Sequence, residues 1–567
     1  MKRLLLLVLL SGSLLYSCKQ DGSAVNPFDY TSTKDTTVSN GAVVSAHPLA
    51  SAAGAYILRK GGNAVDAAIA TQLALAVVFP EAGNIGGGGF TVIRLNDGKN
   101  ITIDYREKAP GKAFRDMYLD SAGNPLLNLS QDGHLASGVP GAIAGIFESM
   151  KYAKLPFEKL IQPAIDLAEK GFAITAAEAR GLNRTKDDFL KYNTVTPAFV
   201  KSSGEWKAGD TLIQTDLANT LKRIQKEGAK GFYEGETAKL IVEEMQRGGG
   251  IISYDDLKNY QAKEREPIFF DYKGYQILTM PLPSSGGIIV EQMLKMSEMY
   301  ALDTMKFNSA QAVNLMAEIE RRCFADRGKY LGDPDFYKVP VKTLVSDSYL
   351  KDRMANFVPG KAGNSVDIKE GIIPESEETT HFSVIDKDGN AVSVTTTING
   401  GYGSRVVVGH AGFLMNNEMD DFSVKPGVPN MFGAVGQEAN AVQPDKRMLS
   451  SMTPTIVLKD GKPWAILGTP GGTTIITSVY QTIVDLIDFK MSAHDAVNMP
   501  KFHHQWLPDV VYLEKGFDEN VKAELEAMGY TIKPRGAIGR TEVILVNADG
   551  TITAVADHRG DDSAAGY

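Results

Sequence analysis

The stretch ETTHFSVIDKDGNAVSVTTTIN, residues 378–399, decides how this chain folds. Two alternating runs rich in β-branched residues flank an Asp-Gly turn, which predicts a β-hairpin. If the loop has three residues, with Gly389 in the left-handed conformation, Thr397 lies opposite Thr379, and alternation places Asn399 on the same face. A two-residue turn would shift the pairing by one residue and turn that face away. Taken alone, the hairpin gives its threonines no function beyond their preference for strands.

Length and composition indicate a large globular protein. The chain has 567 residues, of which 43% are hydrophobic and 22% charged. These values exclude a peptide hormone, a disulfide miniprotein, a disordered chain and a polytopic membrane protein. A net charge of -9 provides no basic surface for a phosphate backbone, so no nucleic-acid partner is expected.

The N-terminus is typical of an export signal. Lys2 and Arg3 precede the apolar run 4–10, and a cleavage-like end follows with Cys18 at the junction. This pattern resembles a bacterial lipoprotein signal, which implies a signal peptide over 1–17 and a lipid anchor on Cys18. The alternative is an ordinary secretory signal. In either case we expect an exported protein, and the lipoprotein reading places it in the periplasm or at the outer membrane, held to the bilayer by lipid only.

The polar stretch 18–40 follows the signal and is expected to be a tether. The region 50–80 predicts buried helix with a break at 61–63, and a further helix is predicted over 474–486. Helical patterns dominate 157–302.

Several common catalytic motifs are absent from the sequence. There is no P-loop, no His-Glu-x-x-His, no cysteine pair at zinc spacing and no Gly-x-Ser-x-Gly. The glycine run 86–89 lacks the dinucleotide-binding frame and precedes a strand-like run, so it indicates close backbone packing. His503 and His504 are adjacent and would point to opposite faces of a strand. We therefore expect no metal and no cofactor.

A series of motifs then extends over most of the chain. They are HPLA at 47–50, DYRE at 104–107, ETTHFSVIDKDGN at 378–390, NNEMDDF at 416–422, SSMTPT at 450–455, TPGG at 469–472 and PKFHHQW at 500–506. In this order they resemble the signature of the γ-glutamyltransferases, which belong to the N-terminal-nucleophile hydrolases. The resemblance covers essentially the whole chain beyond the tether.

The resemblance implies an α+β fold, a four-layer αββα sandwich formed jointly by two chains. The precursor of this family cuts itself before a threonine, which corresponds here to a cut between Glu378 and Thr379. The expected products are a large subunit, 41–378 after the tether, and a small catalytic subunit, 379–567. They would remain together as a heterodimer.

The implied nucleophile is Thr379, and its chemistry suits the cut. A threonine hydroxyl needs a base, and the newly exposed α-amine has an ordinary pKa of about 7.7–8.0, near working pH. Thr397 would orient Thr379, in agreement with the hairpin register. The backbone N–H groups of Gly471 and Gly472 would form the oxyanion hole.

A γ-glutamyl group carries an α-carboxylate and an α-ammonium, so its pocket needs cationic and anionic ligands. The resemblance also implies a lid over the pocket in which Phe432 occupies a position where relatives often have Tyr. Phe432 cannot donate a hydrogen bond to Asn399, so a looser lid is expected. The implied ligands are Arg106, Ser450 and Ser451 for the carboxylate and Asn399, Glu418 and Asp421 for the ammonium.

The function implied is cleavage of the γ-glutamyl amide of glutathione and related compounds through an ester on Thr379. The acyl group would pass to water, an amino acid or a short peptide. One alternative is a related acylase acting on glutaryl-type or poly-γ-glutamate amides, and Glu418 and Asp421 argue against its glutaryl form because a glutaryl group has no amine. A second alternative is a lipoprotein that keeps the fold as a non-catalytic binding module.

Overall fold

The computed structural model describes residues 26–368, 379–425 and 437–567. Cys18, Glu378 and Phe432, to which the sequence assigns the lipid anchor, one side of the cut and the lid, lie outside the described residues.

Two seven-stranded sheets form the centre of the molecule. The first, in spatial order, contains β19 (Ser563–Gly566), β2 (Ala42–Ser45), β10 (Thr379–Ile385), β11 (Ala391–Thr397), β3 (Gly88–Arg94), β4 (Asn100–Asp104) and β7 (Lys263–Arg265). The second contains β1 (Asp35–Val38), β18 (Ile552–Val555), β17 (Glu542–Val546), β13 (Lys462–Gly468), β12 (Thr455–Lys459), β9 (Tyr275–Thr279) and β8 (Ile268–Tyr272). Neighbouring strands in both sheets are antiparallel.

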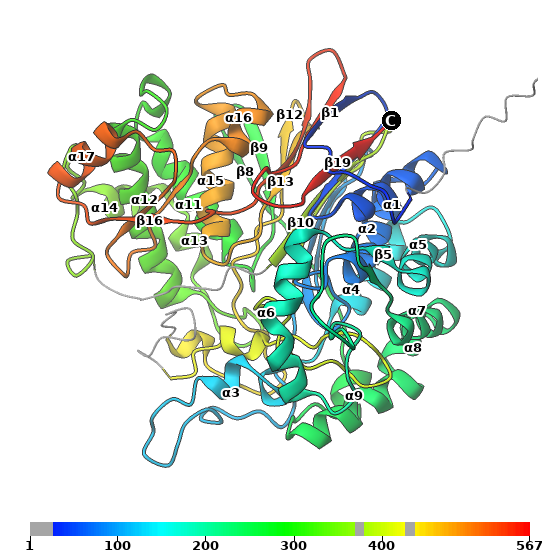
Figure 1. Cartoon of the computed structure of the whole chain (residues 1–567). Helices are drawn as coiled ribbons and strands as arrows, with labels where there is room; N and C mark the ends of the chain where they lie inside the picture. The colour runs from blue at the N-terminus through cyan, green and yellow to red at the C-terminus, as the bar shows by residue number, and fades with distance from the viewer. Residues whose placement is uncertain (1–25, 369–378, 426–436) are drawn as a thin grey trace, which may run out of the picture.

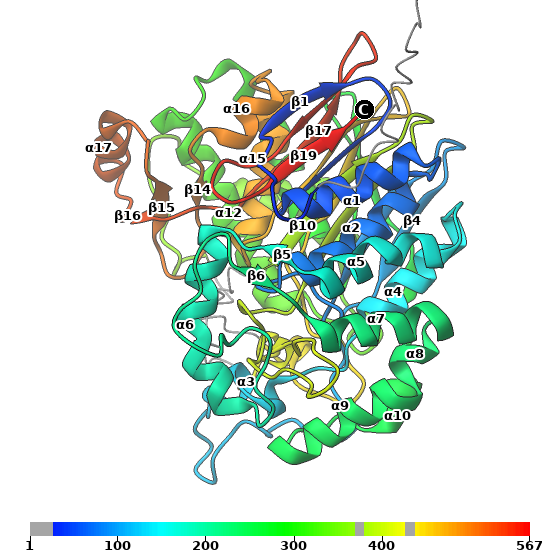
Figure 2. The same ribbon diagram turned by 45° about the vertical axis from the view of Figure 1, so that its right-hand side comes forward.

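Helices cover the outer face of each sheet (Figures 1 and 2). Beside the first sheet lie α1 (Pro48–Arg59), α2 (Ala64–Val78), α4 (Ala142–Ser149), α5 (Phe157–Lys170) and α7 (Thr215–Glu227). Beside the second lie α11 (Gly286–Glu298), α12 (Ala310–Tyr330), α15 (Thr474–Ile487) and α16 (Ala493–Asn498). The inner faces of the two sheets pack on each other, because Val44 and Val92 of the first share a core with Ile466 and Ile544 of the second. This is the expected αββα sandwich.

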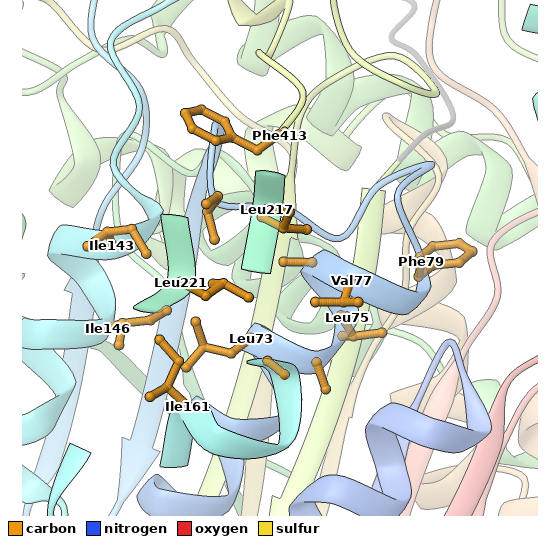
Figure 3. Close-up of a cluster of buried hydrophobic side chains, with 14 of the residues drawn as sticks. Leu73, Leu75, Val77, Phe79, Ile143, Ile146, Ile161, Leu217, Leu221 and Phe413 are labelled. Atoms are coloured by element: carbon orange, nitrogen blue, oxygen red, sulfur yellow. The ribbon is translucent and has the colours of Figure 1, made fainter. Parts of the chain in front are cut away.

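The helix α2 shows how the sequence produces the outer layer. Asn63 and Asp66 form a reciprocal capping box at its start, and the helix ends before Pro80, as predicted. All fifteen of its residues are buried. Figure 3 shows Leu73, Leu75 and Val77 of α2 in one apolar cluster with side chains of α4, α5 and α7. The predicted break at 61–63 separates α1 from α2.

The hairpin has the register expected for a three-residue loop. Thr379 pairs with Thr397, the Asp386 N–H donates to the Asn390 carbonyl at 3.1 Å, and Gly389 has a φ of 83°. The two strands are buried throughout and lie in the middle of the first sheet. The predicted helix over 474–486 is also present, as α15.

The expectation of a tether over 18–40 is wrong for its last part. Residues 35–38 form β1, an edge strand paired antiparallel with β18. The Lys34 ammonium donates to the Asp557, Gly560 and Asp562 carbonyls at 2.6–2.9 Å, which fixes the entry to this strand. The sequence did not indicate this strand, because four residues are too short a run to show strand alternation and the partner strand lies at the other end of the chain. Of the helices in the described ranges, none combines the length and apolarity needed to cross a bilayer.

Candidate active site

One small pocket brings together residues from six separate segments of the chain. Nine of the ten described residues with implied catalytic or binding roles line it, and Gly471, the tenth, precedes Gly472 in the same turn. Two lining residues, Met452 and Ile475, were not singled out from the sequence. The lining residues are Arg106, Thr379, Thr397, Asn399, Glu418, Asp421, Ser450, Ser451, Met452, Gly472 and Ile475.

The two threonines meet at the end of the hairpin. The Thr379 hydroxyl donates to the Thr397 hydroxyl oxygen at 3.5 Å, and that oxygen also accepts the Asn399 N–H at 2.8 Å. Asn399 has a φ of 70°, which turns the chain at the strand end, and its side-chain amide donates to the Asn417 carbonyl at 3.0 Å. Thr397 is therefore positioned to fix the orientation of the Thr379 oxygen.

The glycine run 86–89 packs against the back of the hairpin. A Cβ on Gly87 would lie 2.1 Å from the Thr397 carbonyl oxygen. The Asn84 side chain joins the same two segments, since its oxygen accepts the Gly87 N–H at 3.0 Å and its amide donates to the Thr397 carbonyl at 2.9 Å. The close-packing interpretation of this run is confirmed, and the run supports Thr397 directly.

Gly471 and Gly472 form a turn that leads into α15. Both have positive φ values, 130° and 58°. Within the described ranges, neither backbone N–H donates to a protein acceptor, whereas the Gly471 carbonyl accepts both the N–H and the hydroxyl of Thr474. Two uncommitted N–H groups close to a helix N-terminus suit a developing negative charge.

Arg106 lies in the anionic part of the pocket. It is 1% exposed and forms buried ion pairs with Glu418 and Asp421, and Glu107 is 3.5 Å away. Burial opposes its charge, but these carboxylates outweigh that effect and raise the Arg106 pKa. Arg106 is thus paired with the acids that are expected to bind an ammonium group. A zwitterion could supply new partners to both sides, its carboxylate to Arg106 and its ammonium to the acids.

Two carboxyl groups here have raised pKa values. Burial raises the pKa of Glu418 well above its ordinary value, although Arg106 opposes the shift. Burial likewise raises the pKa of Glu107 to about 7, again against Arg106. Glu107 is part of the DYRE motif, but nothing in the sequence indicated that its buried carboxyl would lie beside Arg106 as a third acid.

Histidine is not positioned to act as the base. His381, two residues after Thr379, hydrogen-bonds Thr395 at 2.9 Å and Ser383 at 3.1 Å, and burial lowers its pKa to about 3. His503 and His504 contact different partners, Thr477 and Asp509. The described part of the chain contains no cluster of ligands suited to a metal ion.

The comparisons agree on one family. The family model described as "Gamma-glutamyltranspeptidase" matches residues 50–567. A glutathione hydrolase proenzyme of Escherichia coli (strain K12) is 48% identical over 532 residues, which cover 93% of this chain and 92% of that protein. A γ-glutamyltranspeptidase structure from Helicobacter pylori is 43% identical and covers 60% of this chain and 97% of its own, with a TM-score of 0.57. A cephalosporin acylase structure from Bacillus halodurans, 26% identical, has a TM-score of 0.82 and covers 96% of this chain and 99% of its own.

Proposed function

The chain belongs to the gamma-glutamyltranspeptidase family, and from this membership we propose a role for each residue of the pocket. The enzyme is an autoprocessing γ-glutamyltransferase that cleaves the γ-glutamyl amide of glutathione and related compounds. It transfers the acyl group to water, an amino acid or a short peptide. The mature form is a heterodimer of its own two chains and acts on small molecules.

Maturation begins at Thr379. Its hydroxyl attacks the carbonyl carbon of Glu378, and the peptide C–N bond breaks as a C–O ester bond forms. Water then hydrolyses the ester, which leaves a carboxylate on Glu378 and a free α-amine on Thr379. Thr397 supports this step because its oxygen accepts the Thr379 hydroxyl at 3.5 Å and so directs it.

Catalysis uses the same hydroxyl with the liberated amine as its base. An amine of ordinary pKa near 7.7–8.0 is partly neutral at working pH and can take the hydroxyl proton, directly or through a water. Thr379 then attacks the γ-carbonyl, the substrate amine leaves with a proton, and a γ-glutamyl ester remains. The N–H groups of Gly471 and Gly472 stabilise the oxyanion, and one such donor is typically worth about 2.7–4 kcal/mol.

The two ends of the glutamyl zwitterion bind to opposite partners. Its ammonium would replace Arg106 beside Glu418 and Asp421, with Asn399 nearby, while its carboxylate would pair with the released Arg106. Ser450 and Ser451 complete the carboxylate site. One charge pair at about 4 Å is worth roughly 4 kcal/mol at an effective dielectric of 20, before desolvation.

A single observation supports these roles most strongly: Thr379 lines the same pocket as the buried pairs of Arg106 with Glu418 and Asp421. The test is the intact mass of a soluble form that begins after Cys18 and is left to mature without protease. Two chains that divide between Glu378 and Thr379 are expected, and Thr379→Ala should remain one chain. A wild-type protein that remains a single stable chain would contradict the assignment.

The substrate class is tested by competition between γ-glutamyl and glutaryl anilides. Preference for γ-glutamyl is expected because Glu418 and Asp421 gain an ammonium partner only from that donor. Equal rates would instead favour the acylase alternative.

We further propose that residues 1–17 are removed, that Cys18 is lipidated and that the enzyme is a lipoprotein of the periplasm or the outer membrane. The subunits would end and begin at Glu378 and Thr379. Metabolic labelling with a fatty-acid probe should mark wild type, and Cys18→Ser should lose both the label and the membrane fraction. A wild-type protein without label would indicate an ordinary secretory signal.

A further inference from the structure

A second buried arginine lies behind the serine pair of the pocket. Arg327, near the C-terminal end of α12, is 1% exposed. Its Nε donates to the Ser285 hydroxyl oxygen at 2.7 Å, and its Nη2 donates to the Ser451 hydroxyl oxygen at 2.8 Å. Ser451 lines the pocket, whereas Arg327 does not. A fixed positive charge therefore reaches the pocket through one hydroxyl group.

This contact determines the direction of the Ser451 hydrogen bond. A guanidinium can only donate, so the Ser451 oxygen must accept. In the described part of the chain, the Ser451 proton has no acceptor and is left for a ligand. Ser450 is arranged in the same way, because its oxygen accepts the Met452 N–H at 3.1 Å. Two hydroxyl donors at one end of a pocket suit a carboxylate, which only accepts.

The arginine is itself held by a rigid neighbour. Ser285, at the start of α11, donates both its backbone N–H and its hydroxyl to the Ser450 carbonyl at 2.7 Å. Its hydroxyl proton is thus used, and its oxygen accepts from Arg327. Arg327, Ser285 and the backbone of Ser450 form one connected unit, so the position of the charge is tied to the position of the serines.

The two arginines would contact a bound carboxylate in different ways. Arg106 is paired with Glu418 and Asp421, so it must exchange partners before it can pair with a carboxylate of the donor. Arg327 keeps its contacts to Ser285 and Ser451 while the serine protons remain available. A carboxylate that accepts these protons does not have to displace either contact.

We propose that Arg327 is a positioning residue for the α-carboxylate of the donor, acting through Ser451 and selecting donors that carry that carboxylate. The inference rests on the proposed γ-glutamyltransferase function. It predicts dependence on one charged group of the substrate, whereas a purely structural arginine would affect all donors alike.

The test compares Arg327→Lys and Arg327→Met with wild type on three p-nitroanilides: γ-glutamyl, glutaryl and 4-aminobutyryl. The glutaryl donor keeps the carboxylate and lacks the ammonium, and the 4-aminobutyryl donor has the reverse pattern. For Arg327→Met, kcat/KM should fall about 10- to 100-fold on the two carboxylate donors, mainly through KM, because a hydrogen-bond network to a charged group is lost. The 4-aminobutyryl donor should change less than threefold. Arg327→Lys should restore part of the loss.

Arg322 provides a matched control. It lies in the same helix, is equally buried at 1% and bonds to Glu318, Arg353 and Asn356. Arg322→Met should lower the thermal midpoint without changing the ratio between the three donors. If Arg327→Met does not fold or mature, the ratio is measured with Arg327→Lys and with Ser285→Ala, which removes the Nε acceptor.

The outcomes separate the two proposals. Equal losses on all three donors, or an unchanged ratio in Arg327→Lys and Ser285→Ala, would overturn the role of Arg327. A wild-type enzyme that matures but does not cleave the γ-glutamyl donor would overturn the proposed function instead.

Discussion

Replacement of Gly87 by alanine should slow maturation about 100-fold, although no residue that lines the pocket is substituted. The added Cβ would lie 2.1 Å from the Thr397 carbonyl oxygen, whereas ordinary contacts begin at 3.4 Å, a deficit of 3.4 − 2.1 = 1.3 Å. It would also lie 2.8 Å from the Asn84 side-chain oxygen and from Ile398. The shortest of these contacts is with a backbone atom, which cannot turn aside as a side chain can, so the end of β11 must move.

The cost follows from the contacts that are lost. Overpacking of this kind costs about 1–3 kcal/mol, and loss of the Asn84–Thr397 hydrogen bond adds about 1 kcal/mol, for a total of about 2–4 kcal/mol. The Thr379 and Thr397 hydroxyl oxygens are already 3.5 Å apart, so a shift of about 1 Å breaks their contact. Misplacement of a reacting group by this amount costs about 100-fold in rate.

The assay is intact mass against time after purification, together with the thermal midpoint. Gly87→Ala should mature about 100-fold more slowly and melt earlier. Gly536→Ala is the matched control, because Gly536 is exposed, has no positive φ and has no atom within 4 Å of an added Cβ. Wild-type maturation in Gly87→Ala would refute the idea that the glycine run sets the position of Thr397.

Four further predictions concern the pocket, its lid and the surrounding core. Asp421→Asn should lower kcat/KM for γ-glutamyl anilide by about 10- to 100-fold and leave the glutaryl anilide nearly unchanged, since only the former has an ammonium; equal losses would argue against an ammonium site. The rate should fall about tenfold per pH unit below about pH 7.7, because the protonated Thr379 amine accepts no proton. The same fall should be seen in Glu107→Gln, which removes a buried carboxyl whose pKa of about 7 would otherwise offer another explanation. Burial raises the pKa of Glu178 to about 8, so the contribution of this carboxyl to stability is present below pH 4.5 and is lost as the pH rises through 8. The thermal midpoint of Glu178→Gln, relative to that of wild type, should therefore be higher at pH 8 than at pH 5. Phe432→Tyr should lower the ratio of hydrolysis to transfer if a looser lid admits water, and an unchanged ratio would count against that lid.

The features predictable from sequence were those set by neighbouring residues. The sequence predicted the hairpin and left two registers open, of which the structure has the one with a three-residue loop and Gly389 at positive φ. The two N-terminal helices follow from the break at 61–63 and the stop at Pro80. The strand β1 was missed because it has only four residues, three of them polar, and pairs with a partner more than 500 positions later.

For the pocket, local sequence patterns were not sufficient. Its ligands were assigned by resemblance, and no local pattern shows that Arg106 meets Glu418, 312 residues away. Arg327 was not predicted as a functional residue for the same reason. It lies 124 residues before Ser451, and its spacing in the helix indicates only a buried position. Contacts of this kind depend on the tertiary fold and carry no signal in short stretches.

The order of strands in the sheets has a consequence for the enzyme after cleavage. In the first sheet, β2 from the N-terminal chain lies between β19 and β10 of the C-terminal chain, and β11 lies against β3. In the second sheet, the C-terminal chain supplies the four central strands β18, β17, β13 and β12, and the N-terminal chain supplies β1 at one edge and β9 and β8 at the other. Neither chain can leave without opening the backbone ladders of both sheets. Before the cut, unfolding releases one molecule that can refold by itself. After the cut it releases two, so recovery depends on their meeting again, and the lifetime of the mature enzyme is set by how slowly its sheets open.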